Sequence, residues 1–135
     1  MIESTISLNN IYEIKLPKGY LINVDKEITT IYNEENGKGA ISITTYKIPI
    51  EFFFDINVEL RDFANSIDKN LNTQNLLLTV NQYAYSEFIT EHKFWKIFVF
   101  FKNQNAVFMT YNCEIEHKNY EMNEVNNIAE SLKIM

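Results

Sequence analysis

The side chains best suited to metal chemistry lie near the two histidines. His117 follows Glu114 and Glu116, and in an extended strand these two carboxylates would share one face. Imidazole and carboxylate both bind zinc, but a metal site needs several convergent ligands, and one strand end supplies only a local cluster. His92 stands beside Glu91 in a predicted turn. Such charges are common on protein surfaces, so we expect neither a metal nor a cofactor.

Nucleophilic catalysis is not predicted. Cys113, the single cysteine, lies close to His117 in sequence, but strand alternation gives it the same face as Tyr111 and Ile115. We assign that face to the core, where a free cysteine acts as a small hydrophobe. No serine lies in a Gly-x-Ser-x-Gly setting, and residues 37–39 are too short to cradle a phosphate. The sequence therefore predicts a protein that is not an enzyme.

The charge balance argues against partners that carry phosphate. The chain has a net charge of −6, a pI near 4.9 and a single arginine, Arg61. An acidic surface repels the nucleic-acid backbone, and one guanidinium cannot form an arginine cluster. We expect no nucleic-acid binding, and an acidic surface of this kind suits a basic protein partner.

No segment predicts secretion or membrane insertion. A single cysteine cannot form an internal disulfide, as expected in a reducing compartment. Residues 1–7 lack the basic and apolar regions of a signal peptide. The longest apolar run, residues 97–101, is far too short to span a bilayer. We expect a cytoplasmic protein with no membrane partner.

Two amphipathic helices are predicted from apolar residues at helical spacing. The first spans residues 57–72, with Asp55 or Asn57 as its N-cap. The second spans residues 122–132. Each has one apolar stripe, so each must pack against a sheet.

Strands are predicted on either side of the first helix. The first group covers residues 12–16, 28–32 and 40–46, with a short apolar stretch at 20–24. The second covers residues 83–89, 94–101 and 106–115, preceded by residues 76–80 as a short strand or an extended lead-in. Gly37 and Gly39 lie in a turn of the first group, where we expect at least one of them to have a positive φ. Short links between the strands favour an antiparallel sheet.

Both faces of this sheet are apolar, so it should lie between two layers. We assign one face to Trp95, Ile97, Val99, Phe101, Val107, Met109, Tyr111, Cys113 and Ile115. The other receives Tyr83, Tyr85, Phe94, Phe98, Phe100 and Phe108. We expect the C-terminal helix to cover the first face and to bury Trp95, and the first helix to cover the second. The prediction is one α+β domain over residues 1–135, ordered β-β-β-α-β-β-β-α, with a sheet of about six strands between helices.

Several local sequences resemble the PsbP-like superfamily. Residues 12–20, Tyr-Glu-Ile-Lys-Leu-Pro-Lys-Gly-Tyr, are similar to the opening strand of that family and its Leu-Pro-x-Gly-aromatic phrase. Residues 128–134 are similar to its last helix. The resemblance covers nearly the whole chain and implies an α/β/α sandwich. It also implies a role in binding, because it brings no catalytic or ion-binding residues that can be matched here.

The leading functional hypothesis is a non-enzymatic protein-binding module, either an immunity protein that neutralises a basic toxin or a chaperone-adaptor for a secreted effector. The second sheet face is wider than one helix of about 10 Å diameter can cover, so part of it should stay open. An aromatic floor with an acidic rim would suit a basic partner. The expected contact residues are Phe98, Phe100 and Phe108 on the floor and Glu87, Glu114 and Glu116 on the rim.

Two alternatives remain open. The partner could instead contact residues 52–54, three consecutive phenylalanines in a connecting segment. The chain could also be a small-ligand-binding protein, with an aromatic pocket between sheet and helix lined by Tyr83, Tyr85 and Phe98.

Overall fold

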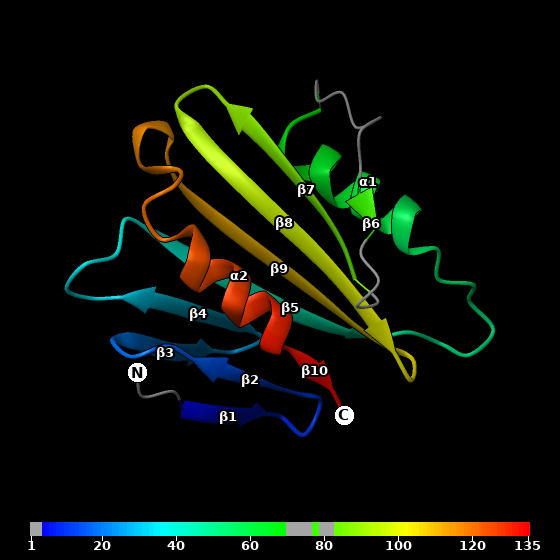
Figure 1. Ribbon diagram of the computed structural model, residues 1–135. Helices are drawn as coiled ribbons and strands as arrows, with labels where there is room; N and C mark the ends of the chain where they lie inside the picture. The colour runs from blue at the N-terminus through cyan, green and yellow to red at the C-terminus, as the bar shows by residue number, and fades with distance from the viewer. Residues whose placement is uncertain (1–3, 70–76, 79–82) are drawn as a thin grey trace.

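The computed structural model describes residues 4–69, 77–78 and 83–135 (Figure 1). The elements in chain order are β1 (Ser4–Leu8), β2 (Tyr12–Leu16), β3 (Tyr20–Asp25), β4 (Ile28–Asn33), β5 (Gly39–Lys47), α1 (Ile56–Ile67), β6 (Leu77–Leu78), β7 (Tyr83–Thr90), β8 (Lys93–Lys102), β9 (Asn105–Glu114), the 3₁₀ turn η1 (Ile115–His117), α2 (Met122–Ser131) and β10 (Lys133–Ile134). No helix in these residues is long and apolar enough to cross a membrane.

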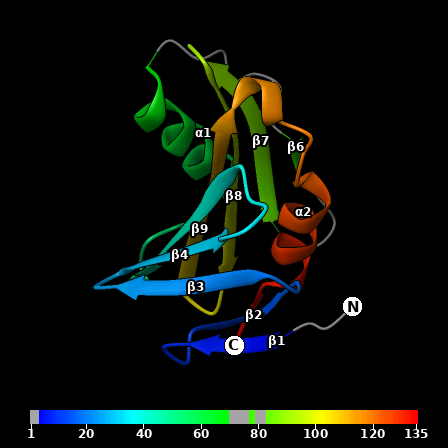
Figure 2. The same cartoon turned by 90° about the vertical axis from the view of Figure 1, so that its left-hand side faces the viewer.

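Within the described residues, the strands form two antiparallel sheets. The larger has seven strands in the order β3-β4-β5-β9-β8-β7-β6, and the smaller has the order β1-β2-β10. Figure 2 shows α1 and α2 on opposite faces of the larger sheet, with β1 and β2 below. The predicted α+β fold, with an antiparallel sheet between helices, is confirmed. The small sheet was not predicted, because β10 has only two residues and β1 is mostly exposed.

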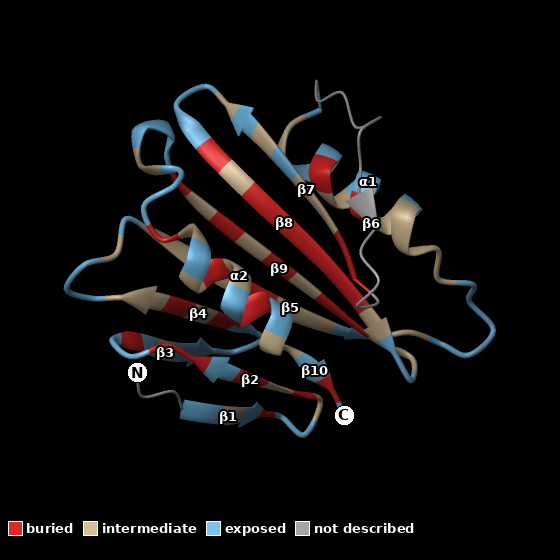
Figure 3. Ribbon diagram, viewed as in Figure 1, coloured by how far each residue is buried: buried red, intermediate tan, exposed pale blue. Residues whose placement is uncertain are grey.

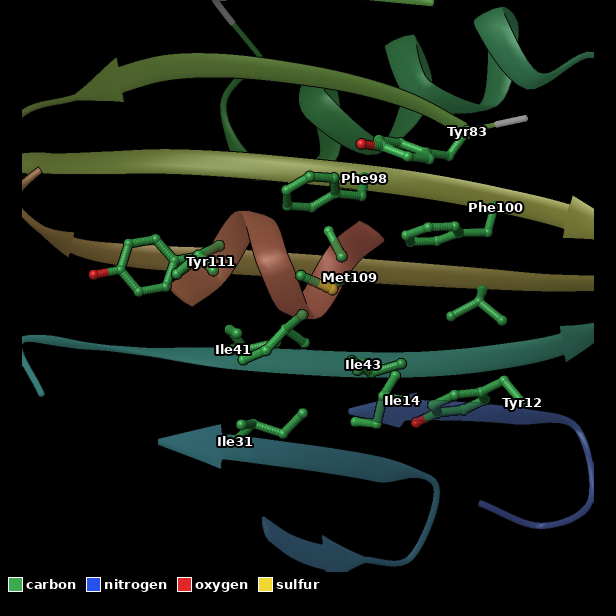
Figure 4. Close-up of a cluster of buried hydrophobic side chains, with 14 of the residues drawn as sticks. Tyr12, Ile14, Ile31, Ile41, Ile43, Tyr83, Phe98, Phe100, Met109 and Tyr111 are labelled. Atoms are coloured by element: carbon green, nitrogen blue, oxygen red, sulfur yellow. The ribbon is translucent and has the colours of Figure 1, made fainter. Parts of the chain in front are cut away.

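The core on the α2 side joins both sheets. Helix α2 contributes Val125, Ile128 and Ala129, and the large sheet contributes aromatic and aliphatic side chains of β4, β5, β7, β8 and β9. Strand β2 adds Tyr12 and Ile14 from the small sheet (Figure 4). The small sheet therefore acts as a second cover beside α2.

A smaller core lies under α1. Leu60 and Ala64 of the helix pack on Ala84, Ile97 and Val99 of β7 and β8. The helix ends at Ile67, earlier than predicted, and residues 70–72 of that prediction lie outside the described residues. Its N-cap is Asp55, as predicted.

The predicted sheet faces were wrong. The hairpin register pairs Phe98 with Met109 and Val99 with Phe108, so even-numbered residues of β8 share a face with odd-numbered residues of β9. The prediction placed odd-numbered residues of both strands on one face. The two-residue turn instead places Lys102 opposite Asn105, so each pair joins an even-numbered and an odd-numbered residue. On β8 the helices therefore cover the faces opposite to those expected, whereas on β9 they cover the expected faces, with Met109 and Tyr111 towards α2 and Phe108 towards α1.

Trp95 lies on the α1 side of the sheet, and it is only half-buried. Its ring stacks on Phe88 at 6.3 Å between centroids, and its Nε1–H donates to Oγ1 of Thr90 at 2.8 Å. The expected cover by the C-terminal helix is wrong, and the burial is less complete than predicted.

The glycine prediction was also wrong. Gly19 is the glycine with a positive φ, at +92°, while Gly37 and Gly39 adopt ordinary conformations. Gly39 is needed for space, since a Cβ there would lie 2.1 Å from the carbonyl oxygen of Asn112.

Candidate functional site

An open hollow beside α1 lies over the part of the large sheet that the helix does not cover. We call it the aromatic groove, and its volume is about 520 Å³. Its walls come from the end of β5, the β5–α1 loop, one flank of α1 and one residue of β9. The aromatic residues that line it are Tyr46, Phe52, Phe54, Phe63 and Phe108.

The floor of the groove is built from rings in edge-to-face contact. The Phe108 ring lies 5.0 Å from that of Phe63 and 5.4 Å from that of Tyr46, with planes at 83° in both pairs. Aromatic rings prefer this arrangement, which adds stability beyond buried area. Tyr46 is nevertheless 55% exposed, so the groove is accessible from solvent.

The β8–β9 hairpin holds the β5–α1 loop in place. The Gln104 side-chain amide donates to the carbonyl oxygens of Ile48 at 3.1 Å and Pro49 at 3.2 Å. The Gln104 carbonyl accepts from the Ile48 N–H at 2.7 Å. Phe54 stacks on Phe101, with centroids 4.3 Å apart and planes within 7°. The loop is therefore organised before any partner arrives.

The same loop presents apolar side chains to solvent. Ile50 is 85% exposed, Phe53 84% and Phe52 51%. This exposed loop joins β5 to α1 in Figure 3. A second hollow of about 360 Å³ adjoins the aromatic groove, and Phe52 and Phe54 line both. Contiguous exposed apolar surface is typical of interaction sites.

The rim of the groove carries more negative than positive charge. Glu59 and Asp62 of α1 line it together with Lys47 at the end of β5. None of the three forms a salt bridge with a residue that the structure describes. Partial burial raises the pKa of Glu59, and the carboxylates of Asp62 and Asp55 raise it further. A cation in the groove would relieve this repulsion.

The predicted aromatic floor is not a surface. Phe98 is 1% and Phe100 5% exposed, because α2 and β2 enclose them in the core (Figure 4). Phe108 lies on the other face of the sheet, in the aromatic groove. The expectation of an open face failed because it did not include β2 as a cover.

The predicted acidic rim is divided between the two faces. Glu87 lies on the α2 side, 3.2 Å from the Lys96 ammonium group. Glu114 lies on the α1 side, opposite Lys93 in the β8–β9 register. Strand β9 ends there, so Glu116 lies in η1 and the strand alternation expected for the two glutamates does not apply. These exposed carboxylates do not surround a common apolar surface.

The rings of Tyr83, Tyr85 and Phe98, expected to line a ligand pocket, lie against one another. The Phe98 ring lies 6.0 Å from that of Tyr83 and 6.2 Å from that of Tyr85. The Lys96 ammonium group lies 4.7 Å from the centroid of the Tyr85 ring. These described side chains therefore pack on one another on the α2 side of the sheet.

The other groups considered for chemistry have structural environments. Cys113 is buried, as predicted, and burial raises the pKa of its thiol. Among the described residues, no group of three His, Cys, Asp or Glu side chains is placed to hold a metal ion.

Glu121 is a buried carboxylate that accepts hydrogen bonds from the hydroxyls of Tyr20 and Tyr111. These contacts fix the start of α2 against the large sheet.

The groove residues that supply its other rings and its charges were not anticipated as site residues: Tyr46, Lys47, Glu59, Asp62 and Phe63. The signal that could have found the site is the run of phenylalanines at 52–54 in a connecting segment, the alternative contact left open above. The prediction treated α1 only as a cover, and the sequence alone does not reveal that its flank forms a wall.

Comparison with known proteins establishes the fold. No family model matches the chain, and no curated protein matches it. Several solved structures match the chain in fold. The cyanobacterial PsbP (CyanoP) of Synechocystis sp. PCC 6803 is 11% identical with a TM-score of 0.70, over 98% of this chain and 92% of that one. The chain has the PsbP-like fold.

Two further solved structures are similar in fold. A mutant of the protein Mog1 is 9% identical with a TM-score of 0.63, over 99% of this chain and 96% of its own. A protein of Bacteroides thetaiotaomicron is 11% identical with a TM-score of 0.60, over 92% of this chain and 45% of its own. The resemblance seen at residues 12–20 and 128–134 is thus confirmed as a likeness of fold, and these identities carry no function.

Proposed function

We propose that this chain is a non-enzymatic protein-binding module whose docking surface is the aromatic groove and the exposed loop beside it. The observation that carries the proposal is the apolar loop, where Ile50 and Phe53 are each more than four-fifths exposed. Exposing such side chains costs solvation free energy, which burial against a partner recovers at about 25 cal/mol per Å². The PsbP-like fold supports the proposal, because the resemblance implies proteins that act mostly by binding.

An open surface favours a protein over a small molecule as the occupant. The groove volume lies within the range of ligand pockets, about 300–1,000 Å³. Small-ligand pockets usually enclose most of the ligand, whereas Tyr46 and Phe52 each leave half of their surface in water. Binding of a small ligand therefore remains the second candidate function. Its site would be this groove, and not the pocket expected at Tyr83.

The acidic net charge suits a basic partner. A complementary charge speeds association, and both specific roles considered for this protein are compatible with it. An immunity protein would abolish the activity of a basic toxin in a purified mixture. A chaperone-adaptor would keep its effector dissolved without inhibiting it.

The test compares three tagged forms of the full chain in the native host. The wild-type chain should co-purify with a protein in stoichiometric amount. Phe52→Ser/Phe53→Ser should lose that protein, whereas Tyr120→Ser, a matched control that also removes an exposed ring, should retain it. The purified partner should then form a complex with the wild-type chain and not with the double variant. Equal recovery on all three forms, or no stoichiometric protein on the wild type, would contradict the proposal.

A further inference from the structure

The partner's chemistry can be narrowed further if the groove is the docking surface. Three observations bear on it: the lining is aromatic, its rim carries two carboxylates and one lysine, and neither carboxylate has a cation partner among the described residues. Glu59 and Asp62 lie three residues apart on α1, so they face the same side of the helix. Phe63, four residues after Glu59, lines the groove with them.

We infer that the groove takes a bulky apolar side chain flanked by lysine or arginine, presented by a segment of the partner protein. The apolar side chain would fill the hollow against Phe63 and Phe108, where edge-to-face packing favours an aromatic ring. The neighbouring cation would lie over Glu59 and Asp62. This inference rests on the proposed function and specifies the segment that such a partner must expose.

The electrostatics agree with this geometry. Partial burial and the two neighbouring carboxylates raise the pKa of Glu59, so its anionic form is less favoured than that of an isolated glutamate. A bound cation would lower that pKa and stabilise the complex. Lys47 lines the groove from the β5 side, and its ammonium group would repel a bound cation. Removing its charge therefore tests the inference.

Three blocked tripeptides test the inference by nuclear magnetic resonance titration of the isotope-labelled full chain. Acetyl-Lys-Phe-Lys-amide carries both features, acetyl-Glu-Phe-Glu-amide reverses the charge, and acetyl-Lys-Ala-Lys-amide lacks the ring. We expect the first to shift groove resonances, including those of Phe63 and Phe108, and the other two to bind at least about tenfold more weakly. Equal affinities, or shifts that map away from the groove, would overturn the inference.

Two double variants test which carboxylates cause the difference in affinity between the cationic and anionic peptides. Glu59→Gln/Asp62→Asn should bring the affinities of the two phenylalanine peptides within about twofold of each other, because the attraction and the repulsion both disappear. Glu114→Gln/Glu116→Gln removes the same charge from the surface first predicted and should leave the wild-type ratio intact. An unchanged ratio in the groove variant, or a lost ratio in the control, would overturn the inference.

A third variant keeps the test valid if the double substitution perturbs folding. Lys47→Gln should raise the affinity for the cationic peptide by about twofold and lower that for the anionic one, through a simple change in local charge. The opposite trend would contradict the inference. Failure here is distinguishable from failure of the proposed function: a charge-selective groove with a partner that ignores Phe52 and Phe53 refutes the docking proposal alone.

Discussion

At the scale of single residues, the most constrained side chain is the carboxylate of Glu121. It accepts from the hydroxyls of Tyr20 at 2.5 Å and Tyr111 at 2.8 Å. It also accepts from the backbone N–H groups of Lys38 at 3.0 Å and Gly39 at 2.9 Å. One side chain thus ties α2 to β3, β9 and the turn before β5.

Glu121→Gln is therefore expected to lower the free energy of unfolding by about 2 kcal/mol. Glutamine has nearly the same size, but only one of its two terminal atoms accepts, so either Oε1, which accepts from Tyr20, or Oε2, which accepts from Lys38, Gly39 and Tyr111, is replaced by a donor. Urea unfolding measures the loss. Glu130→Gln, on the exposed side of α2, should change stability by less than about 0.5 kcal/mol. Equal stability of both variants would show that the buried network contributes little.

Stability should also fall in alkali. Burial, followed by the hydrogen bond and charge of Glu121, raises the pKa of Tyr20. Burial also raises the pKa of Tyr111, together with hydrogen bonds to Cys113 and Glu121. A raised folded-state pKa gives stability that is complete below the unfolded pKa of about 10 and is lost as pH rises above it, by about 1.4 kcal/mol per pH unit for each tyrosine.

Urea midpoints between pH about 9 and about 11 check this expectation against Tyr20→Phe/Tyr111→Phe. The double variant starts from a lower stability but should decline less steeply, and the contribution of Tyr12, whose pKa burial also raises, is common to both proteins. Parallel declines would mean that these hydroxyls ionise as easily in the folded chain as in the unfolded one.

At the scale of elements, the hairpin register decides which aromatic residues stabilise the core. Phe98→Ala should cost about 4 kcal/mol, since Phe98 is 1% exposed. Trp95→Ala should cost about 2 kcal/mol, because its ring is half-buried and its hydrogen bond to Thr90 lies near the strand end. Chemical unfolding of both variants measures the difference. A larger loss of unfolding free energy for Trp95→Ala than for Phe98→Ala would support the sheet faces assigned from sequence.

Gln104 should act as a positioning residue for the loop. Gln104→Ala removes the bonds to the Ile48 and Pro49 carbonyls, so the Phe52 N–H, which donates to the Pro49 carbonyl, should exchange with deuterium about five- to tenfold faster. Lys102→Ala, a nearby exposed control, should leave that rate unchanged. Identical exchange in both variants would mean that the backbone bond from Ile48 to Gln104 and the stack of Phe54 on Phe101 hold the loop without the Gln104 side chain.

Local sequence was enough to predict most elements of this fold but not their partners. Periodicity identified both helices and the strands of the large sheet, and Asp55 was correctly expected as a cap. The register of the β8–β9 hairpin was not predicted. Which residues of the two strands share a face depends on the turn, where Asn103 and Gln104 both adopt a positive φ. Strand β2 was predicted, but its pairing with β1 and β10 depends on contacts distant in sequence.

At the scale of the whole molecule, the groove follows from unequal cover of the large sheet. The α2 side is closed by a helix and the small sheet together, whereas α1 packs mainly on β7 and β8 and contacts β9 through Phe63 and Phe108. The α1 face of β5 and β9 is left for Tyr46 and Phe108. Sequence reasoning foresaw an aromatic surface with acidic neighbours but placed it on the wrong face, because the number of covering layers is a property of the complete fold.

The central claim is that this loop and groove dock a partner, and site-specific photo-crosslinking tests it most directly. A photoreactive amino acid would replace Phe53 in one form of the full chain and Glu116 in another, both exposed positions, in cells of the native host. We predict a discrete adduct with a second protein from the position of Phe53 and none from that of Glu116. An adduct from the position of Glu116 alone, or adducts of this chain only with itself, would contradict the account.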